Sequence, residues 1–172
     1  MKNKTRWITE TAIMLALLVI LQALTKSAGQ VVTGSCVNAV LAVTVLLAGL
    51  SSGLTVALVS PFVAFLLGIG PQLLPIVPAI ALGNTVYVLL GYLAGKKAPL
   101  WRQILALVCA AAAKFLTLYL VVVKLLCAIV PLKEAQVATF STMFSWPQLI
   151  TALIGGAAAL LIAPVVRKAL HR

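Results

Sequence analysis

The sequence contains almost no acidic residues. Its 172 residues include thirteen lysines and arginines but only two acids, Glu10 and Glu134, so the formal net charge is +11. Carriers that are driven by protons or cations commonly use a buried carboxylate relay, and neither acid lies deep within an apolar run. The scarcity of acids therefore argues against a carrier that works through such a relay.

Groups that commonly carry catalysis are also scarce. The single histidine, His171, lies near the C-terminus, where we expect it to be solvated. There is no Ser/His/Asp set, glycine-rich phosphate loop or metal-ligand cluster. Cys36, Cys109 and Cys127 lie in apolar surroundings without metal-ligand spacing, so we expect buried free thiols and no disulfide framework. The sequence thus predicts neither an enzyme nor a bound metal or cofactor.

Apolar residues dominate what is present. They make up 63% of the chain, charged residues make up 9%, and the mean hydropathy is +1.20. A soluble domain of this length cannot bury so much apolar surface. The residues form long runs, such as Val37–Leu50 and Ile104–Ala113, and not the short alternating segments of a membrane barrel. Because helices satisfy their own backbone groups in hydrocarbon, we predict an all-α, polytopic membrane protein.

Turn-forming and polar residues divide the chain into about six apolar segments, each close to the ~20 residues that a spanning helix needs. We expect one compact bundle and a single transmembrane domain over residues 1–172. The expected helices are 7–24, 34–50, 52–67, 73–95, 101–128 and 143–166. The second and third are short, so they are either tilted spans or one kinked hairpin over 34–67. We expect a tight turn at Ser51–Gly53 and opposite loops at Thr25–Thr33, Gly68–Gln72 and Pro131–Trp146.

The basic residues indicate the orientation of this bundle. An even number of spans places both termini on one side, with Lys2, Lys4, Arg6, Lys96, Lys97, Arg102, Arg167, Lys168 and Arg172, and leaves Lys26 and Lys133 on the other. Cytoplasmic loops carry an excess of Lys and Arg, so we expect both termini in the cytoplasm. Because the basic residues are explained by this orientation, the high positive net charge does not indicate that the protein binds nucleic acid.

Lys114 is the most informative single residue, because it lies near the middle of the fifth apolar segment. A central charge costs at least about 2.5–3.5 kcal/mol on insertion scales, so we expect it to face the bundle interior or a wet cavity. It either binds a ligand, such as an anionic or carboxylate-bearing molecule, or is a structural lysine that snorkels toward the interface or bonds backbone carbonyls. Thr117 shares its helix face. Lys124, nearer the surface, either binds the ligand or reaches the membrane interface unaided.

Uncharged polar residues gather in the half of the bundle away from the termini. Each one alone is explained by an interhelical hydrogen bond, but together they favour a polar pocket that opens outward. The residues that we expect to bind a substrate are Gln30, Asn38, Gln72, Asn84, Lys114, Thr117, Lys124 and Trp146. Trp146 also fits an interfacial anchor.

Small residues recur at a spacing of four, which lets helices pack closely, either within the bundle or against a partner membrane protein. The instances are Ala12 and Ala16 in the first segment, Gly91 and Gly95 in the fourth, and Gly155, Ala159 and Ala163 in the sixth. Ala12 and Ala16 in the first of about six helices, the basic cytoplasmic ends, and the stretches Gly29–Gly34 and Gly83-Asn84 together resemble the substrate-binding S components of energy-coupling factor (ECF) transporters.

This resemblance implies a high-affinity binder of a vitamin or related micronutrient in the plasma membrane of a prokaryote. The pair Ala12 and Ala16 would dock on a transmembrane coupling subunit, and two cytoplasmic ATPase subunits would supply energy. The ligand would lie in the outer half, between the later helices and under the outer loops. A stand-alone carrier or channel is the main alternative, and it predicts flux through this chain alone. A ligand-free scaffold predicts a dry bundle in which Lys114 contacts only protein.

Overall fold

The computed structural model describes residues 2–95 and 98–170, and all regular structure in this part of the chain is helical. The elements are α1 (Lys2–Thr25), η1 (Lys26–Ala28), α2 (Gln30–Leu47), α3 (Leu50–Leu66), α4 (Ile76–Tyr92), α5 (Leu100–Leu118), η2 (Tyr119–Leu126), α6 (Cys127–Ile129), α7 (Glu134–Met143) and α8 (Trp146–Ala169). Lys96, Lys97, His171 and Arg172, which the sequence analysis used, lie outside the described residues, as does the side chain of Lys2.

The expected set of apolar helices is confirmed. Four helical stretches are long and apolar enough to cross a membrane, and they are Lys4–Ala28, Gln30–Leu47, Leu100–Ile129 and Glu134–Ala169. The helices α3 and α4 are apolar but shorter, at 17 residues each. The stretch Leu100–Ile129 contains α5, a π-helical segment η2 and α6 in continuous succession. The chain is therefore an all-helical, multi-pass membrane protein.

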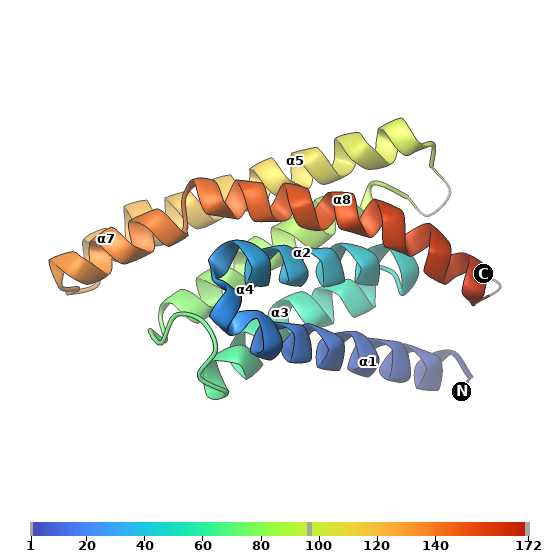
Figure 1. Ribbon diagram of the computed structural model, residues 1–172, viewed down its shortest axis with the longest axis horizontal. Coiled ribbons are helices and arrows are strands. Elements are labelled where there is room, and N and C mark those ends of the chain that lie inside the picture. Colours follow the sequence, from blue (N-terminus) through green and yellow to red (C-terminus); the bar gives the residue numbers. More distant parts are fainter. Residues whose placement is uncertain (1, 96–97, 171–172) are drawn as a thin grey trace.

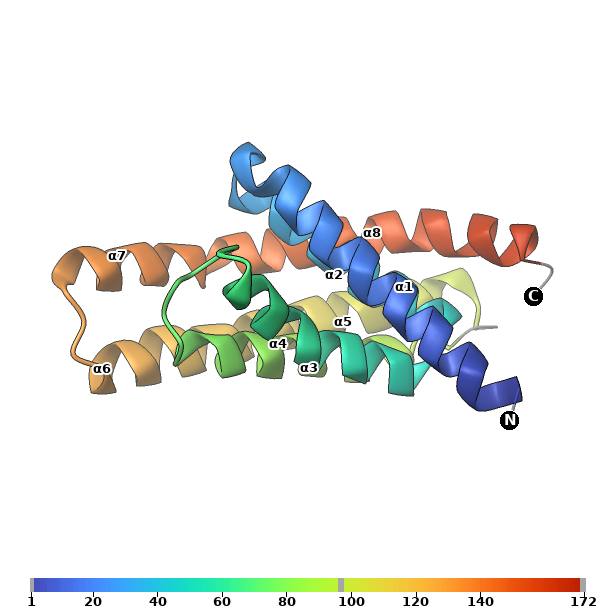
Figure 2. The ribbon, with the colours of Figure 1, turned by 90° about the horizontal axis from the view of Figure 1, so that it is seen from below.

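Helix α2 lies at the centre of the bundle. It packs against α8 and α1 and also contacts α3 and α4, while α5 packs between α4 and α8. Helix α1 crosses the outside of the bundle obliquely (Figure 2). The two ends of the chain lie at one end of the bundle, and α7 lies at the opposite end (Figure 1). The α1–α2 turn and the α3–α4 loop are also directed away from the termini (Figure 1).

Three predicted connections were wrong. The turn expected at Ser51–Gly53 lies at Ala48 and Gly49 instead, because Gly49 adopts the positive φ (100°) that glycine tolerates best. Ser52 then lies in the first turn of α3, where it is buried and accepts a hydrogen bond from Thr11 of α1 at 2.9 Å. The segment 34–67 thus forms two separate helices.

The loop expected at Pro131–Trp146 contains a helix, α7. Its start is fixed by the backbone N–H of Lys133, which donates to Gln136 Oε1 at 3.1 Å. Phe140 and Phe144 are buried and pack with residues of α4, α5 and η2. The stretch expected as a loop at Thr25–Thr33 is likewise largely helical, since α2 begins at Gln30.

The small residues of the last helix pack inside the bundle. Gly155, Ala159 and Ala163 are all buried, and a Cβ atom on Gly155 would lie 2.5 Å from Asn38 Cβ on α2. The close α2–α8 contact therefore uses this face. By contrast, Ala12 and Ala16 on α1 are exposed on the surface of the bundle.

The cysteines are free, as expected, but they are not all buried. Cys36 and Cys127 are half-buried, whereas Cys109 is exposed on α5. An apolar thiol on a lipid-facing surface needs no partner, so burial inside the protein is not required there.

Candidate functional site

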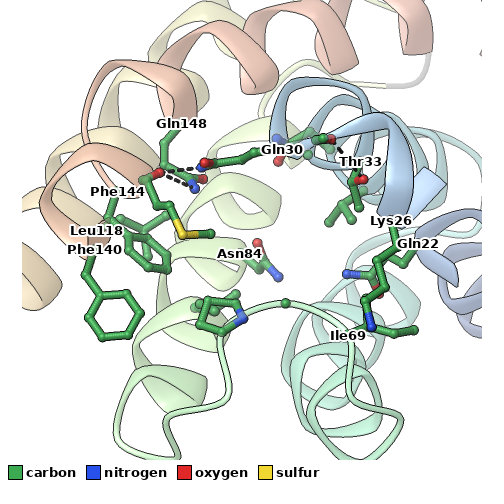
Figure 3. Close-up of a pocket in the computed structure, with 18 of the residues that line it drawn as sticks. Gln22, Lys26, Gln30, Thr33, Ile69, Asn84, Leu118, Phe140, Phe144 and Gln148 are labelled. Carbon is green, nitrogen blue, oxygen red and sulfur yellow. Dashed lines mark hydrogen bonds between the residues drawn. The ribbon is translucent and has the colours of Figure 1, made fainter. Parts of the chain in front are cut away.

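The structure contains a cavity of about 470 Å³. Two of the segments that line it, η1 and α7, lie toward the end of the bundle opposite the termini (Figure 1). The cavity is lined by α1, η1, α2, α4, α5, α7 and α8 and by the α3–α4 loop. Its wall is mainly apolar with a few polar side chains, which are Gln22, Lys26, Gln30, Thr33, Asn38, Asn84, Lys114, Thr139 and Gln148. Figure 3 labels six of them, which are Gln22, Lys26, Gln30, Thr33, Asn84 and Gln148. This combination of apolar and polar side chains is typical of a binding site for a small organic molecule.

Lys114 forms the centre of the polar part of this wall. Its side chain is only 3% exposed, and Nζ donates to Asn38 Oδ1 at 2.6 Å and to Asn84 Oδ1 at 2.7 Å. Nζ also lies 5.6 Å from the centre of the Tyr87 ring, within the range of a cation–π contact. Three helices, α2, α4 and α5, therefore meet at one ammonium group.

Further hydrogen bonds hold the partners of Lys114 in place. Asn38 Nδ2 donates to Thr151 Oγ1 of α8 at 3.3 Å, which leaves Oδ1 directed at the lysine. Tyr87 is buried, and its hydroxyl donates to the backbone oxygen of Ala152 at 3.1 Å. Because each amide is fixed by a second contact or by packing, the ammonium group is held without rearrangement.

Two glycines allow the helices to approach closely at this point. A Cβ atom on Gly155 of α8 would lie 2.5 Å from Asn38 Cβ and 2.6 Å from the backbone nitrogen of Ala39. On α4, a Cβ atom on Gly83 would lie 2.7 Å from Leu118 Cγ, one turn from Lys114 on α5. Neither position has room for a larger residue, so the geometry of the lysine cluster depends on both.

Replacing Gly155 by alanine is expected to lower the thermal stability of the protein and to displace Asn38. Overpacking of this kind typically costs about 1–3 kcal/mol, and here the added methyl group meets backbone atoms that cannot rotate away. Gly91→Ala on α4 is the matched control, because its methyl group would lie at 3.6 Å, an ordinary contact distance. Thermal unfolding in detergent checks both, and equal melting temperatures would contradict the packing argument.

The apolar part of the wall comes largely from α7 and the facing helices. Phe140 of α7 and Phe144, which directly follows α7, are buried beside Leu118 of α5, and Met143 and Ile80 complete the surface. Figure 3 shows Phe140 and Phe144 on one side of the cavity, with Asn84 between them and Gln22. The helix that the sequence analysis missed therefore supplies an aromatic wall.

Hydrogen bonds between distant segments border the cavity. Lys26 Nζ donates to the backbone oxygen of Gly68 at 2.7 Å and so joins η1 to the α3–α4 loop. Gln30 Nε2 and Gln148 Nε2 both donate to the backbone oxygen of Met143, at 2.5 and 3.1 Å (Figure 3). These contacts hold the loops and the α7–α8 junction against the first two helices.

The structure brings together four of the eight residues that the sequence analysis named. Gln30, Asn38, Asn84 and Lys114 all line the cavity. Gln72, Thr117, Lys124 and Trp146 lie outside its lining. Lys124 is exposed, with Nζ 5.5 Å from the centre of the Tyr119 ring, and Trp146 is 66% exposed and stacks on Phe115. Thr117 donates to the backbone of its own helix, and Gln72 is exposed.

Sequence reasoning did not single out Gln22 or the aromatic residues of α7. Gln22 is an amide inside the first apolar run, and that isolation was the available signal. Lys26 was read only as a charge that marks the orientation. No acidic residue is among the side chains that line the cavity, and the sequence has only Glu10 and Glu134. The cavity can therefore offer hydrogen bonds and one buried positive charge, but no carboxylate.

Comparison with known proteins gives one match. A family model described as "ECF transporter, substrate-specific component" matches residues 6–167. No curated protein and no solved structure matches the chain significantly.

Proposed function

The chain belongs to the substrate-specific (S) components of ECF transporters, and on that basis we propose that it captures a vitamin or related micronutrient in the cavity around Lys114. As an S component it is a non-catalytic binding subunit that works with an ECF module. The residues proposed to bind the substrate are Gln30, Asn38, Asn84 and Lys114. The single observation that carries the proposal is a cavity of about 470 Å³ with a buried, hydrogen-bonded lysine in its wall.

The proposed orientation places both termini in the cytoplasm and the cavity toward the outside. Five described basic residues, Lys4, Arg6, Arg102, Arg167 and Lys168, belong to helix ends on the side of the termini. Lys26 and Lys133 belong to the opposite side. The excess of Lys and Arg on cytoplasmic segments supports this orientation, and it directs the cavity toward the solute to be captured.

The proposed partners are a transmembrane coupling subunit and two cytoplasmic ATPase subunits. The exposed position of Ala12 and Ala16 on α1 supports docking through this helix, because small residues let another helix approach closely in a bilayer. The chain itself would contribute binding and no ATP hydrolysis.

Substrate uptake by this protein is expected to require the coupling subunit and the ATPases. The test compares uptake of the small molecule that co-purifies with the protein, in proteoliposomes with the complete complex and with this chain alone. ATP-dependent uptake by the complex, with none by the chain alone, is the expected result. Equal flux through the chain alone would instead favour a stand-alone carrier or channel.

A further inference from the structure

The buried ammonium group of Lys114 has no anionic partner among the described residues. Resting on the function proposed above, we infer the class of substrate: a small organic monoanion, whose carboxylate or similar oxyanion binds Lys114. An apolar ring or chain of this molecule contacts the α7 wall, and a hydrogen-bond donor faces Gln22. Three independent features of the cavity, one for each part of this molecule, carry the inference.

The first feature is the hydrogen bonding of the ammonium group. A lysine ammonium has three N–H donors, and in the described part of the chain two are used by the neutral oxygens of Asn38 and Asn84. The lysine lines the cavity, so a ligand can reach the remaining donor. A buried cation that meets only neutral groups is costly, and an anionic ligand group offsets that cost. A cationic ligand would be repelled, because no carboxylate lines the cavity.

The side chains of the same wall also limit the number of negative charges that the substrate can carry. Lys26 is the other basic residue among the lining side chains, and its Nζ is bonded to the backbone oxygen of Gly68 at the border of the cavity. Only one cation is therefore buried with the ligand. A second negative charge deep in the cavity beside Lys114 would have no second buried cation to pair with, because Lys26 is exposed at the border, and this is unfavourable.

The second feature is the aromatic wall. Phe140 and Phe144 are buried at the edge of the cavity, and Leu118, Ile80 and Met143 adjoin them. Contact with a fully polar solute would add little binding free energy at this surface, whereas a ring or a short alkyl chain would be stabilised by the apolar area that it buries there. The volume of about 470 Å³ admits a molecule of vitamin size.

The third feature is the amide of Gln22. Its Oε1 atom is buried and has no hydrogen-bond partner among the described residues. Gln22 lines both the main cavity and an adjoining pocket of about 70 Å³ beneath the α3–α4 loop, and Figure 3 shows its side chain at the cavity wall. A buried acceptor without a partner is costly, so an N–H or O–H group of the substrate would restore the missing bond.

Benzoate is the smallest probe that combines the anion with the apolar ring. We expect it to bind the purified protein with a dissociation constant on the order of 1 mM, as typical efficiencies for a ligand of its size indicate. Benzamide, which has the same shape without the charge, should bind at least about tenfold more weakly. Benzylammonium should not bind. Saturation-transfer NMR in detergent, with titrations, measures all three.

The dependence on individual residues completes the test. Lys114→Met should lower benzoate affinity about tenfold or more, with the thermal melting curve as the check that the variant is folded. Addition of an amino group in meta- or para-aminobenzoate should strengthen binding several-fold, and Gln22→Met should remove that gain, which is measured as the ratio of aminobenzoate to benzoate affinity in the same variant. Gln22→Met should not destabilise the ligand-free protein, because it removes an unsatisfied acceptor.

Several results would overturn the inference. The first is that benzamide or benzylammonium binds as tightly as benzoate, and the second is that a folded Lys114→Met variant still binds benzoate with wild-type affinity. The third is that aminobenzoate still binds more tightly than benzoate in Gln22→Met. The fourth is that benzoate does not bind at about 50 mM, far above the expected dissociation constant. The proposed function fails separately, if the chain forms no complex with an ECF module. A complex that imports a neutral or cationic molecule would leave the function intact and refute only this substrate class.

Discussion

Replacing Lys114 by methionine is expected to lower the affinity for the natural substrate by about 100-fold or more. Truncation of one partner in a buried, hydrogen-bonded charge pair costs about 2–5 kcal/mol, and each 1.4 kcal/mol is a factor of ten. Methionine keeps much of the length and apolar character of the lysine stem, so the wall of the cavity stays filled. The loss should therefore reflect the ammonium group and its bonds to Asn38 and Asn84.

Lys124→Met is the matched control for this experiment. Lys124 lies in the same continuous helical stretch as Lys114, but its side chain is exposed and its Nζ lies against the Tyr119 ring outside the cavity lining. The same change there should leave the affinity within about twofold, as for most surface substitutions. The measurement is a titration with the small molecule that co-purifies with the wild-type protein, identified after release by mass spectrometry. Equal affinity losses in the two variants would contradict a special role for Lys114.

The melting behaviour of Lys114→Met carries further information. The change removes a buried charge, which favours the folded state, but leaves Asn38 Oδ1 and Asn84 Oδ1 without their donor. These effects oppose each other, so we expect little net change in the melting temperature of the ligand-free protein. A substantial drop in melting temperature without loss of affinity would instead indicate a structural lysine.

The fold was predictable because the bilayer imposes simple rules. Long apolar runs can only be helices in hydrocarbon, and the third to sixth segments were placed close to their observed bounds. The errors arose where a few residues decide the local geometry. Gly49 and not the polar stretch Ser51–Gly53 supplies the turn conformation, and the capping bond of Gln136 begins a helix within an apparent loop.

The site was predictable only in part, because the sequence indicates how deep a residue lies in an apolar segment but not whether its side chain points into the cavity. Lys114, Asn38 and Asn84 could be inferred because a polar group deep in an apolar segment must find partners. Thr117 and Lys124 lie on the same helical stretch but do not face the cavity. Residues 119–126 of that stretch are π-helical, so positions beyond Tyr119 do not follow the usual 3.6-residue spacing. Nothing in the sequence marks that change.

The first helix combines two features at different depths. Ala12 and Ala16 are exposed near the middle of the helix, whereas Gln22 lies near its C-terminal end and lines the cavity. Between them, Leu18 is fully buried in the core. A docking surface and part of a binding site can therefore share one helix without sharing side chains.

Replacing Ala16 by tryptophan is accordingly expected to abolish the complex with the coupling subunit and ATP-dependent uptake, while substrate affinity stays within about twofold of the wild type. A tryptophan side chain would keep an approaching helix from the close backbone contact that a small-residue face permits. Ala112→Trp on α5 is the matched control, because Ala112 is also exposed and α5 makes no contact with α1 among the principal helix pairs.

Co-purification with the coupling subunit and the ATPases, followed by a binding titration on the isolated chain, separates the possible results. Loss of the complex in Ala16→Trp but not in Ala112→Trp, with binding retained, would assign docking to the exposed face of α1. Loss of the complex in both variants would show that any bulky addition to the surface is harmful, and retention in both would exclude this face. Because Gln22 lies near the C-terminal end of α1 and Lys26 lies in η1 beyond it, loss of substrate binding together with docking would mean that the whole helix shifts.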